Sequence, residues 1–331
     1  YLNGTKLGVH EGGFTPFNFE ITNIIKAKDN FLVVKVDNKR LAEGVPTLNT
    51  DWWNYGGITR DVLLIEEPET FIQDYNIQLK KGENNKLKGY VKLNTSNTSE
   101  KIAVSIPELK INQEVAANSD FEINAENIKY WSLESPKLYD VFIKTKFQTI
   151  KDQIGFRIIE TSGADILLNG KKVFLKGISI HEENATGGRG SSEADALRLL
   201  NWAKELGCNF VRLAHYPHNE NMIHLADKMG ILVWEEIPVY WTVDFAKEAI
   251  LANAKNQLSE VITRDKNRAS VIIWSVANET PISDVRNNFL LNLVNHAKSL
   301  DDSRLLSAAL MHRDINGVST IDDKIGENLD I

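Results

Sequence analysis

An apolar run at residues 270–277 ends abruptly in Asn278 and Glu279. A carboxyl group at the end of a buried strand can donate a proton to a reacting group or remove one from it. Polar residues also commonly begin helices, so the pair is equally suited to capping a following helix. The pattern alone leaves catalysis and capping open.

Three other apolar runs end in residues that can do chemistry. His181 follows the first run, Arg212 and His215 belong to the second, and Glu235 and Glu236 end the third. An arginine in an apolar strand requires a carboxylate partner, because an unpaired buried charge is costly. We expect one of the two glutamates to point toward the site and the other to pair with a neighbouring cation.

The histidines also raise the question of a metal. His215 and His218 are three residues apart, with His224 nearby, but no HExxH motif or matching carboxylate accompanies them. No Gly-rich phosphate-binding motif follows any of the strands. We therefore expect neither a metal nor a cofactor.

The second half of the chain alternates strands with helices. An Asn-Gly hairpin at 169–170 leads into a buried strand, and Ser192 opens a helix with a capping-box spacing to Asp195. Further strands are expected near 210–215, 231–238, 270–279 and 304–310, with helices between them. Near-continuous apolar strands separated by helices indicate a parallel sheet. The reactive residues lie at the carboxyl ends of the strands, which favours a (β/α)8 barrel over a doubly wound sheet.

The first half of the chain has the alternating pattern of β-structure. Short Val- and Ile-rich runs, including 31–38 and 61–67, recur about every ten residues. A break near 66–69 divides this half, so the predicted domains are residues 1–67, 68–160 and 161–331.

Composition limits the partners. The net charge is −7 and the basic residues form no stripe, which argues against nucleic acid. No apolar run reaches the ~20 residues of a membrane span. A single cysteine, Cys208, leaves a cytoplasmic, periplasmic or secreted location open. A homo-oligomer is compatible with the sequence.

Five segments resemble the family 2 glycoside hydrolases, the group of the β-galactosidases and β-glucuronidases. They follow the family's order and are HEGGFTPFNFEIT at 10–22, NYGGITRDV at 54–62, FLKGISIHEEN at 174–184, RLAHYPHNE at 212–220 and WSVANE at 274–279. The resemblance implies a jelly-roll sugar-binding domain, an immunoglobulin-like sandwich and a catalytic (β/α)8 TIM barrel.

The resemblance also implies roles for particular residues. Glu279 matches the family's acid/base, and Asn278 matches the residue that binds the sugar 2-hydroxyl. Arg212 matches the arginine that holds the nucleophile in place. His181 and His215 match histidines that face sugar hydroxyls. Asp51 matches an acidic residue contributed by the sugar-binding domain, although a turn-forming aspartate is an alternative.

The predicted function is that of a retaining β-glycosidase acting on β-galactosides or β-glucuronides by double displacement. Such enzymes use two carboxyl groups ~5 Å apart, and burial with a neighbouring carboxylate must keep the acid protonated. Five barrel strands are expected before residue 331, and the family's nucleophile, a Glu after the seventh strand, is expected beyond it. We therefore interpret the sequence as an internal fragment that is inactive alone. The alternative is a non-catalytic carbohydrate-binding or scaffolding protein.

Overall fold

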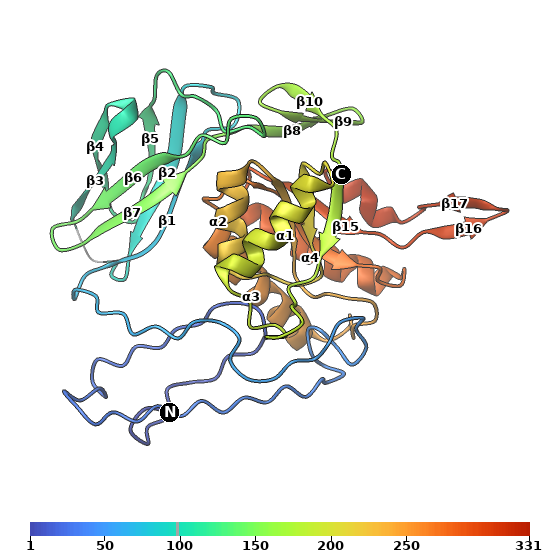
Figure 1. Ribbon diagram of the computed structural model, residues 1–331, viewed down its shortest axis with the longest axis horizontal. Coiled ribbons are helices and arrows are strands. Elements are labelled where there is room, and N and C mark those ends of the chain that lie inside the picture. The colour runs from blue at the N-terminus through green and yellow to red at the C-terminus, as the bar shows by residue number, and fades with distance from the viewer. Residues whose placement is uncertain (97–98) are drawn as a thin grey trace.

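A computed structural model describes residues 1–96 and 99–331 of the chain. Figure 1 shows three parts: an N-terminal segment in blue, a β-sandwich at the upper left, and a parallel sheet with its helices in yellow to red. Among the described residues, no helix has both the length and the apolar character needed to cross a lipid bilayer.

The first 70 residues contain no regular strand, only isolated bridges from Leu2 to Thr5 and Leu32. The predicted strands at 31–38 and 61–67 are therefore wrong. A strand forms only where a second segment supplies ladder hydrogen bonds. The apolar residues of these runs instead lie exposed, as Val33 and Leu63 illustrate.

The sandwich packs a three-stranded sheet, ordered β1-β2-β5, against a four-stranded sheet, ordered β4-β3-β6-β7. Alternate residues point inward, and Ile77, Leu87, Val104 and Val141 are fully buried. The strands are β1 (Ile72–Leu79), β2 (Lys86–Leu93), β3 (Lys101–Ile106), β4 (Ile111–Ala116), β5 (Asp120–Asn124), β6 (Tyr139–Lys144) and β7 (Thr149–Ile154), with a 3-10 turn η1 (Pro107–Leu109) after β3.

A small antiparallel sheet links the sandwich to the parallel sheet. Its strands are β8 (Ile159–Ser162), β9 (Asp165–Leu168) and β10 (Lys171–Val173). Asn169 and Gly170 join β9 to β10 with φ of 53° and 74°. Positive φ at both turn residues suits the twist of a tight hairpin, so the predicted Asn-Gly turn is confirmed.

The parallel sheet has the order β11-β12-β13-β14-β15, so each strand lies beside its neighbour in sequence. All eight residues of β14 are buried, as expected for a sheet covered on both faces. The strands are β11 (Gly177–Ile180), β12 (Phe210–Leu213), β13 (Leu232–Glu236), β14 (Val271–Asn278) and β15 (Leu305–Ala309). Within the described residues, β11 and β15 are each paired on one side only.

The helices are α1 (Glu193–Glu205), α2 (Glu220–Met229), α3 (Glu248–Asp265) and α4 (Asp284–Leu300). The predicted capping box is confirmed, because Ser192 and Asp195 exchange side-chain to backbone hydrogen bonds at the start of α1. After β15 come a short hairpin, β16 (Arg313–Ile315) and β17 (Val318–Thr320), and the 3-10 turn η2 (Lys324–Asn328).

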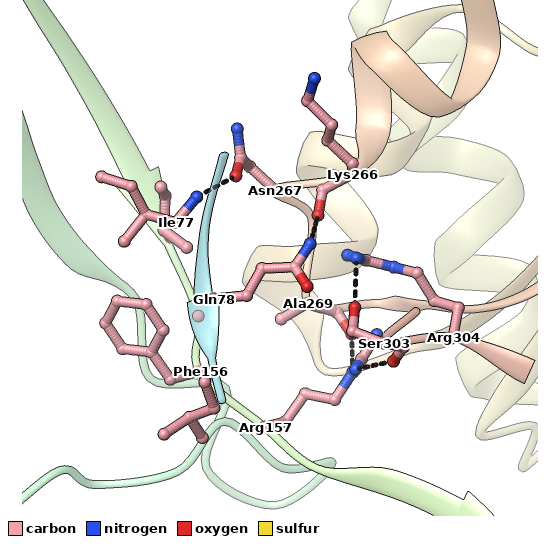
Figure 2. Close-up of a pocket in the computed structure, with 12 residues that line it drawn as sticks. Ile77, Gln78, Phe156, Arg157, Lys266, Asn267, Ala269, Ser303 and Arg304 are labelled. Carbon is pink, nitrogen blue, oxygen red and sulfur yellow. Dashed lines mark hydrogen bonds between the residues drawn. The ribbon is translucent and has the colours of Figure 1, made fainter. Parts of the chain in front are cut away.

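The sandwich packs against the amino-terminal ends of β14 and β15. Arg157, just after β7, donates hydrogen bonds to the backbone carbonyls of Ala269, Val271 and Ser303 at 2.6–3.1 Å. Figure 2 shows this contact, with Asn267 accepting a hydrogen bond from the backbone of Ile77. The opposite, carboxyl-terminal edge of the sheet is therefore left for other residues.

Candidate active site at the carboxyl ends of the strands

The parallel register brings the polar ends of four strands together. Ser179 pairs with Arg212, Arg212 with Trp234, and Glu236 with Ser275. Each strand ends near the same level, so His181, Arg212, Glu236 and Asn278 project from one edge of the sheet.

Glu236 is the centre of this cluster. Its buried carboxylate accepts hydrogen bonds from Arg212 Nη2 at 2.9 Å and from Trp234 Nε1 at 3.0 Å. His215 Nδ1 lies 2.8 Å from Glu236 Oε1. A carboxylate only accepts, so the Nδ1–H of His215 is the donor. Glu236 is thus the carboxylate partner that Arg212 was expected to have.

Asn278 joins the same cluster through Arg212. The Nη2 atom of Arg212 donates to Asn278 Oδ1 at 2.6 Å, which directs the amide nitrogen away from the arginine. The backbone of Asn278 is tied to Val239 and Trp241. Arg212 therefore orients Asn278 while being held itself by Glu236.

Glu279 follows β14 with a left-handed backbone, φ 46°. This conformation is rare outside glycine and asparagine, and such residues gather at functional sites. Trp241 Nε1 donates to Glu279 Oε2 at 3.1 Å. The helix-capping interpretation is wrong, because Ser283 caps α4.

The expected burial of Glu279 is also wrong, since the residue is exposed. It lies beyond the end of β14 and beside β15, which has one neighbouring strand among the described residues. Within the described part of the chain its side chain is therefore open to solvent, with Trp241 beside it.

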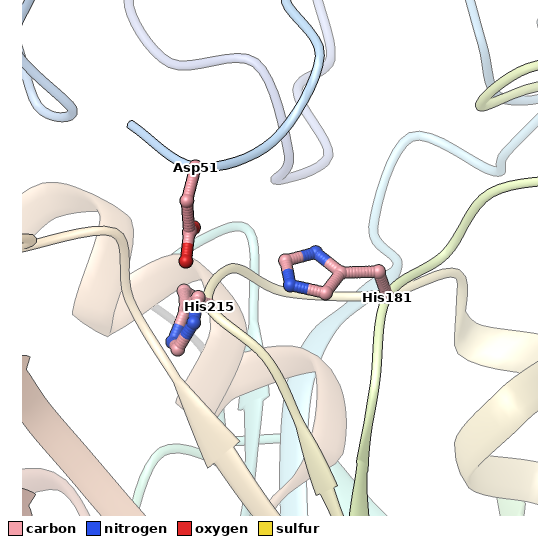
Figure 3. Close-up of side chains that lie close together, drawn as sticks. All are labelled: Asp51, His181 and His215. Atoms are coloured by element: carbon pink, nitrogen blue, oxygen red, sulfur yellow. The ribbon is translucent and has the colours of Figure 1, made fainter. Parts of the chain in front are cut away.

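Asp51 reaches this edge from the N-terminal segment. One ligand atom each from Asp51, His181 and His215 lies within 4.8 Å of the others, and Figure 3 shows their side chains converging. Tyr240, which is buried, forms a hydrogen bond with Asp51. Burial, and next the neighbouring His215, lower the pKa of His181. The structure therefore brings all six predicted site residues to one edge of the sheet.

His218 takes no part in this convergence. It is completely buried, and one of its ring nitrogens, Nε2, lies 3.1 Å from the carbonyl oxygen of Ala214. Burial lowers the pKa of His218 well below its usual value. His218 is thus a buried core histidine, although its Nδ1 has no hydrogen-bond partner among the described residues.

Aromatic residues support the site: Tyr216, which the sequence did not single out, and Trp52, for which stacking on a sugar and packing in the core were both open. Tyr216 Oη lies 3.3 Å from His181 Nδ1, and Trp52 packs against Tyr216 and Tyr240 with ring centroids 5.3 and 4.9 Å apart. Trp52 is 7% exposed, so it packs within the core rather than offering a free face for stacking. In the sequence, Tyr216 could have been recognised as a site residue from its position directly after His215.

An ion pair fixes the N-terminal segment beside the site. Arg60 pairs with the buried Glu182, which follows His181. Glu182 Oε1 also accepts a hydrogen bond from the backbone N–H of Asn219 at 2.7 Å. Burial raises the pKa of Glu182, and the positive charge of Arg60 opposes this. Arg60 and Asp51 thus approach the sheet edge from one segment.

Three family models match consecutive parts of the chain. They describe the sugar binding domain of glycosyl hydrolases family 2 at residues 1–68, a further domain of glycosyl hydrolases family 2 at 64–157, and the family's TIM barrel domain at 159–323. The chain belongs to glycoside hydrolase family 2. The predicted sugar-binding, immunoglobulin-like and TIM-barrel plan is confirmed, and β11–β15 are barrel strands.

Relatives within family 2 carry two kinds of name. A putative beta-glucuronidase from Formosa agariphila is 34% identical over 92% of this chain and 40% of its own length. A beta-galactosidase from Streptococcus thermophilus is 30% identical over 92% of this chain and 32% of its own length. The structure of a Ruminococcus gnavus b-glucuronidase in complex with C6-substituted uronic isofagomine superposes with a TM-score of 0.85 at 28% identity, covering 94% of this chain and 58% of that one. The chain thus spans a third to three fifths of these relatives.

A buried arginine lies between two carboxylates where β13 meets the end of α3. Arg264 Nη2 lies 2.9 Å from Glu235 Oε1 and also contacts Asp265, and all three residues are largely buried. One cation faces two carboxylates, so burial and then the charge of Asp265 raise the pKa of Glu235 well above its usual value. Glu235 is therefore the glutamate that pairs with a neighbouring cation.

This raised pKa predicts a pH-dependent stability. Above the ordinary pKa of an unfolded Glu and below the folded value, the folded state holds the extra proton. Its contribution to the free energy of unfolding then falls by ~1.4 kcal/mol per pH unit as pH rises. We expect Glu235→Gln to remove this share of the slope. Urea unfolding between about pH 5 and pH 8 measures it.

The matched control is Glu160→Gln, which alters an exposed carboxylate in β8. It should leave the pH slope of the free energy of unfolding as it is in the unaltered protein. Equal slopes for Glu235→Gln and the unaltered protein would contradict a raised pKa at Glu235.

Proposed function

We propose that the protein carrying this chain is a retaining β-glycosidase that hydrolyses β-galactosides or β-glucuronides. The observation that carries the proposal is the hydrogen-bonded chain from Glu236 through Arg212 to Asn278, which ends beside Glu279. Relatives named beta-glucuronidase and beta-galactosidase support the same chemistry.

In this proposal Glu279 is the acid/base. Its carboxyl group protonates the departing glycosidic oxygen, and its carboxylate later removes a proton from the attacking water. Trp241 holds one oxygen of Glu279, leaving the other directed to substrate. Asn278 is held by Arg212 where it can bind the sugar 2-hydroxyl, a contact that strengthens as positive charge develops on the ring.

Asp51, His181 and His215 bind further sugar hydroxyls in this proposal. They offer both hydrogen-bond donors and acceptors, which a polyhydroxylated ligand requires. His215 is oriented by Glu236 and Asp51 by Tyr240, so little ordering remains when the sugar binds.

Glu236 serves as a positioning residue rather than the attacking carboxylate. Arg212, Trp234 and His215 all contact its two oxygens, and in this proposal Glu236 orients Arg212 and His215. The second carboxylate of the double displacement is, in this proposal, the nucleophilic glutamate that the family resemblance implies.

The test is turnover of nitrophenyl glycosides by the longest natural protein that carries this sequence. We expect release of nitrophenol from the β-galactoside or the β-glucuronide, none from the matching α-anomers, and a first product of retained configuration by NMR. Binding of these sugars without turnover would instead favour the non-catalytic carbohydrate-binding alternative.

A further inference from the structure

The side chains proposed to bind sugar hydroxyls are also arranged as a metal site. They are Asp51, His181 and His215. Among the described residues, this is the one group of three or more His, Cys, Asp or Glu side chains whose ligand atoms converge, all within 4.8 Å. Two imidazoles and a carboxylate are a donor set that suits zinc, with a fourth position left for water. We propose that these three residues bind Zn²⁺ and that zinc thereby controls access to the site.

The residues behind the three ligands are arranged as in metal sites. A metal-bound histidine usually donates its other ring N–H to a carboxylate or another oxygen, which fixes its tautomer. His215 Nδ1 lies 2.8 Å from Glu236 Oε1, leaving Nε2 free to bind. His181 Nδ1 lies 3.3 Å from Tyr216 Oη, an oxygen that can accept a hydrogen bond from the Nδ1–H group.

The three ligands differ in their exposure to solvent. Tetrahedral zinc places its ligand atoms about 3.4 Å apart, so the group must contract slightly. His181 and His215 are partly buried at strand ends, whereas Asp51 is exposed in the N-terminal segment. The proposal therefore assigns this slight contraction to Asp51, the exposed ligand.

The charges around the group also suit a cation. Glu236 lies behind His215, and Glu279 interacts electrostatically with Tyr240, which binds Asp51. Two cations lie nearby. Arg212 is paired with Glu236, although its Nη2 also lies 3.2 Å from His215 Nδ1, and Arg189 acts electrostatically on His181.

Zinc binding is tested by titration of the protein against a chromophoric chelator, with Co²⁺ absorption reporting the ligand geometry. We expect one Zn²⁺ per chain at this site. Asp51→Asn, His181→Gln and His215→Gln should each weaken zinc binding at least tenfold, and Glu236→Gln, which alters a supporting residue, by about 10- to 100-fold. Asp51 is exposed, so Asp51→Asn is the variant least able to disturb folding.

The matched control is His224→Gln, which removes an exposed histidine on α2 outside the group. It should bind zinc as the unaltered protein does. Loss of zinc in this control but not in the three ligand variants, or no binding at millimolar zinc, would overturn the proposal.

The effect on activity rests on the proposed function. Zinc would occupy the side chains that bind sugar hydroxyls, so it should raise KM with little change in kcat, and a chelator should reverse the effect. If zinc binds at Asp51 without inhibiting turnover, the metal site stands. The proposed role of these three residues in binding sugar hydroxyls is then wrong. Turnover with no zinc binding would overturn the metal site and leave the glycosidase proposal standing.

Discussion

Glu279→Gln is expected to reduce hydrolysis of alkyl β-glycosides by ~10²- to 10⁴-fold in the protein that carries this chain. An alkoxide is a poor leaving group and departs only when the acid protonates it. A nitrophenolate leaves without protonation, so formation of the glycosyl-enzyme from nitrophenyl glycosides should fall far less. The measurement is kcat/KM for a matched pair of alkyl and nitrophenyl substrates.

Added azide tests the second role of Glu279, as the general base. Water needs a general base to attack the glycosyl-enzyme, whereas the azide anion does not. Azide should therefore accelerate turnover of nitrophenyl glycosides by Glu279→Gln and yield a glycosyl azide. Glutamine preserves the size of the side chain, so the left-handed backbone at this residue is unchanged.

The control is Glu205→Gln, an exposed glutamate at the end of α1. It should retain normal activity on both substrates and show no response to azide. Equal losses on alkyl and nitrophenyl substrates in Glu279→Gln would rule out Glu279 as the acid/base.

The barrel strands could be predicted from the sequence because their pattern is local. Near-continuous apolar runs bounded by glycines and helix caps specify β12 to β15 and the helices between them. The parallel register then follows, and it places Arg212, Glu236 and Asn278 at one edge. Their residue types suggested a site before any geometry was known.

The contacts within the site could not be predicted, because they join distant parts of the chain. Nothing local indicates that Glu236, rather than Glu235, faces Arg212; that depends on which side of β13 each residue occupies. The approach of Asp51 depends on the packing of the N-terminal segment over the barrel. The alternating pattern at 31–38 predicted a strand, but among the described residues this segment pairs only through an isolated bridge from Leu32 to Leu2.

The site and the sandwich use opposite ends of the same sheet. Arg157 binds carbonyls at the amino-terminal ends of β14 and β15, while Asn278 and Glu279 lie at the other end of β14. Packing against the sandwich can therefore stabilise the sheet without restricting the face where a ligand would enter. The N-terminal segment, by contrast, contributes Asp51 directly.

The segment after Glu279 is held by a completely buried ion pair. Arg286 on α4 donates from Nε to Thr280 Oγ1 at 2.7 Å and from Nη1 to Asp323 Oδ1 at 2.8 Å. The side chains of Arg286 and Asp323 are both 0% exposed. We expect Arg286→Leu to lower the free energy of unfolding by about 3–5 kcal/mol, because it leaves the carboxylate of Asp323 buried without its partner.

The double variant Arg286→Leu/Asp323→Leu separates pairing from packing. Removing both charges should restore most of the stability, since replacing a buried pair by apolar residues is often close to neutral. About 1 kcal/mol should remain lost, because Asp323 also caps η2 by accepting from the N–H of Ile325. Lys172→Leu, which breaks the exposed pair with Asp165, is the control and should cost about 0–1 kcal/mol. Urea unfolding of the unaltered protein, Arg286→Leu, Asp323→Leu, the double variant and the control measures these differences. A double variant as unstable as the sum of its two single variants would show that the two charges do not depend on each other.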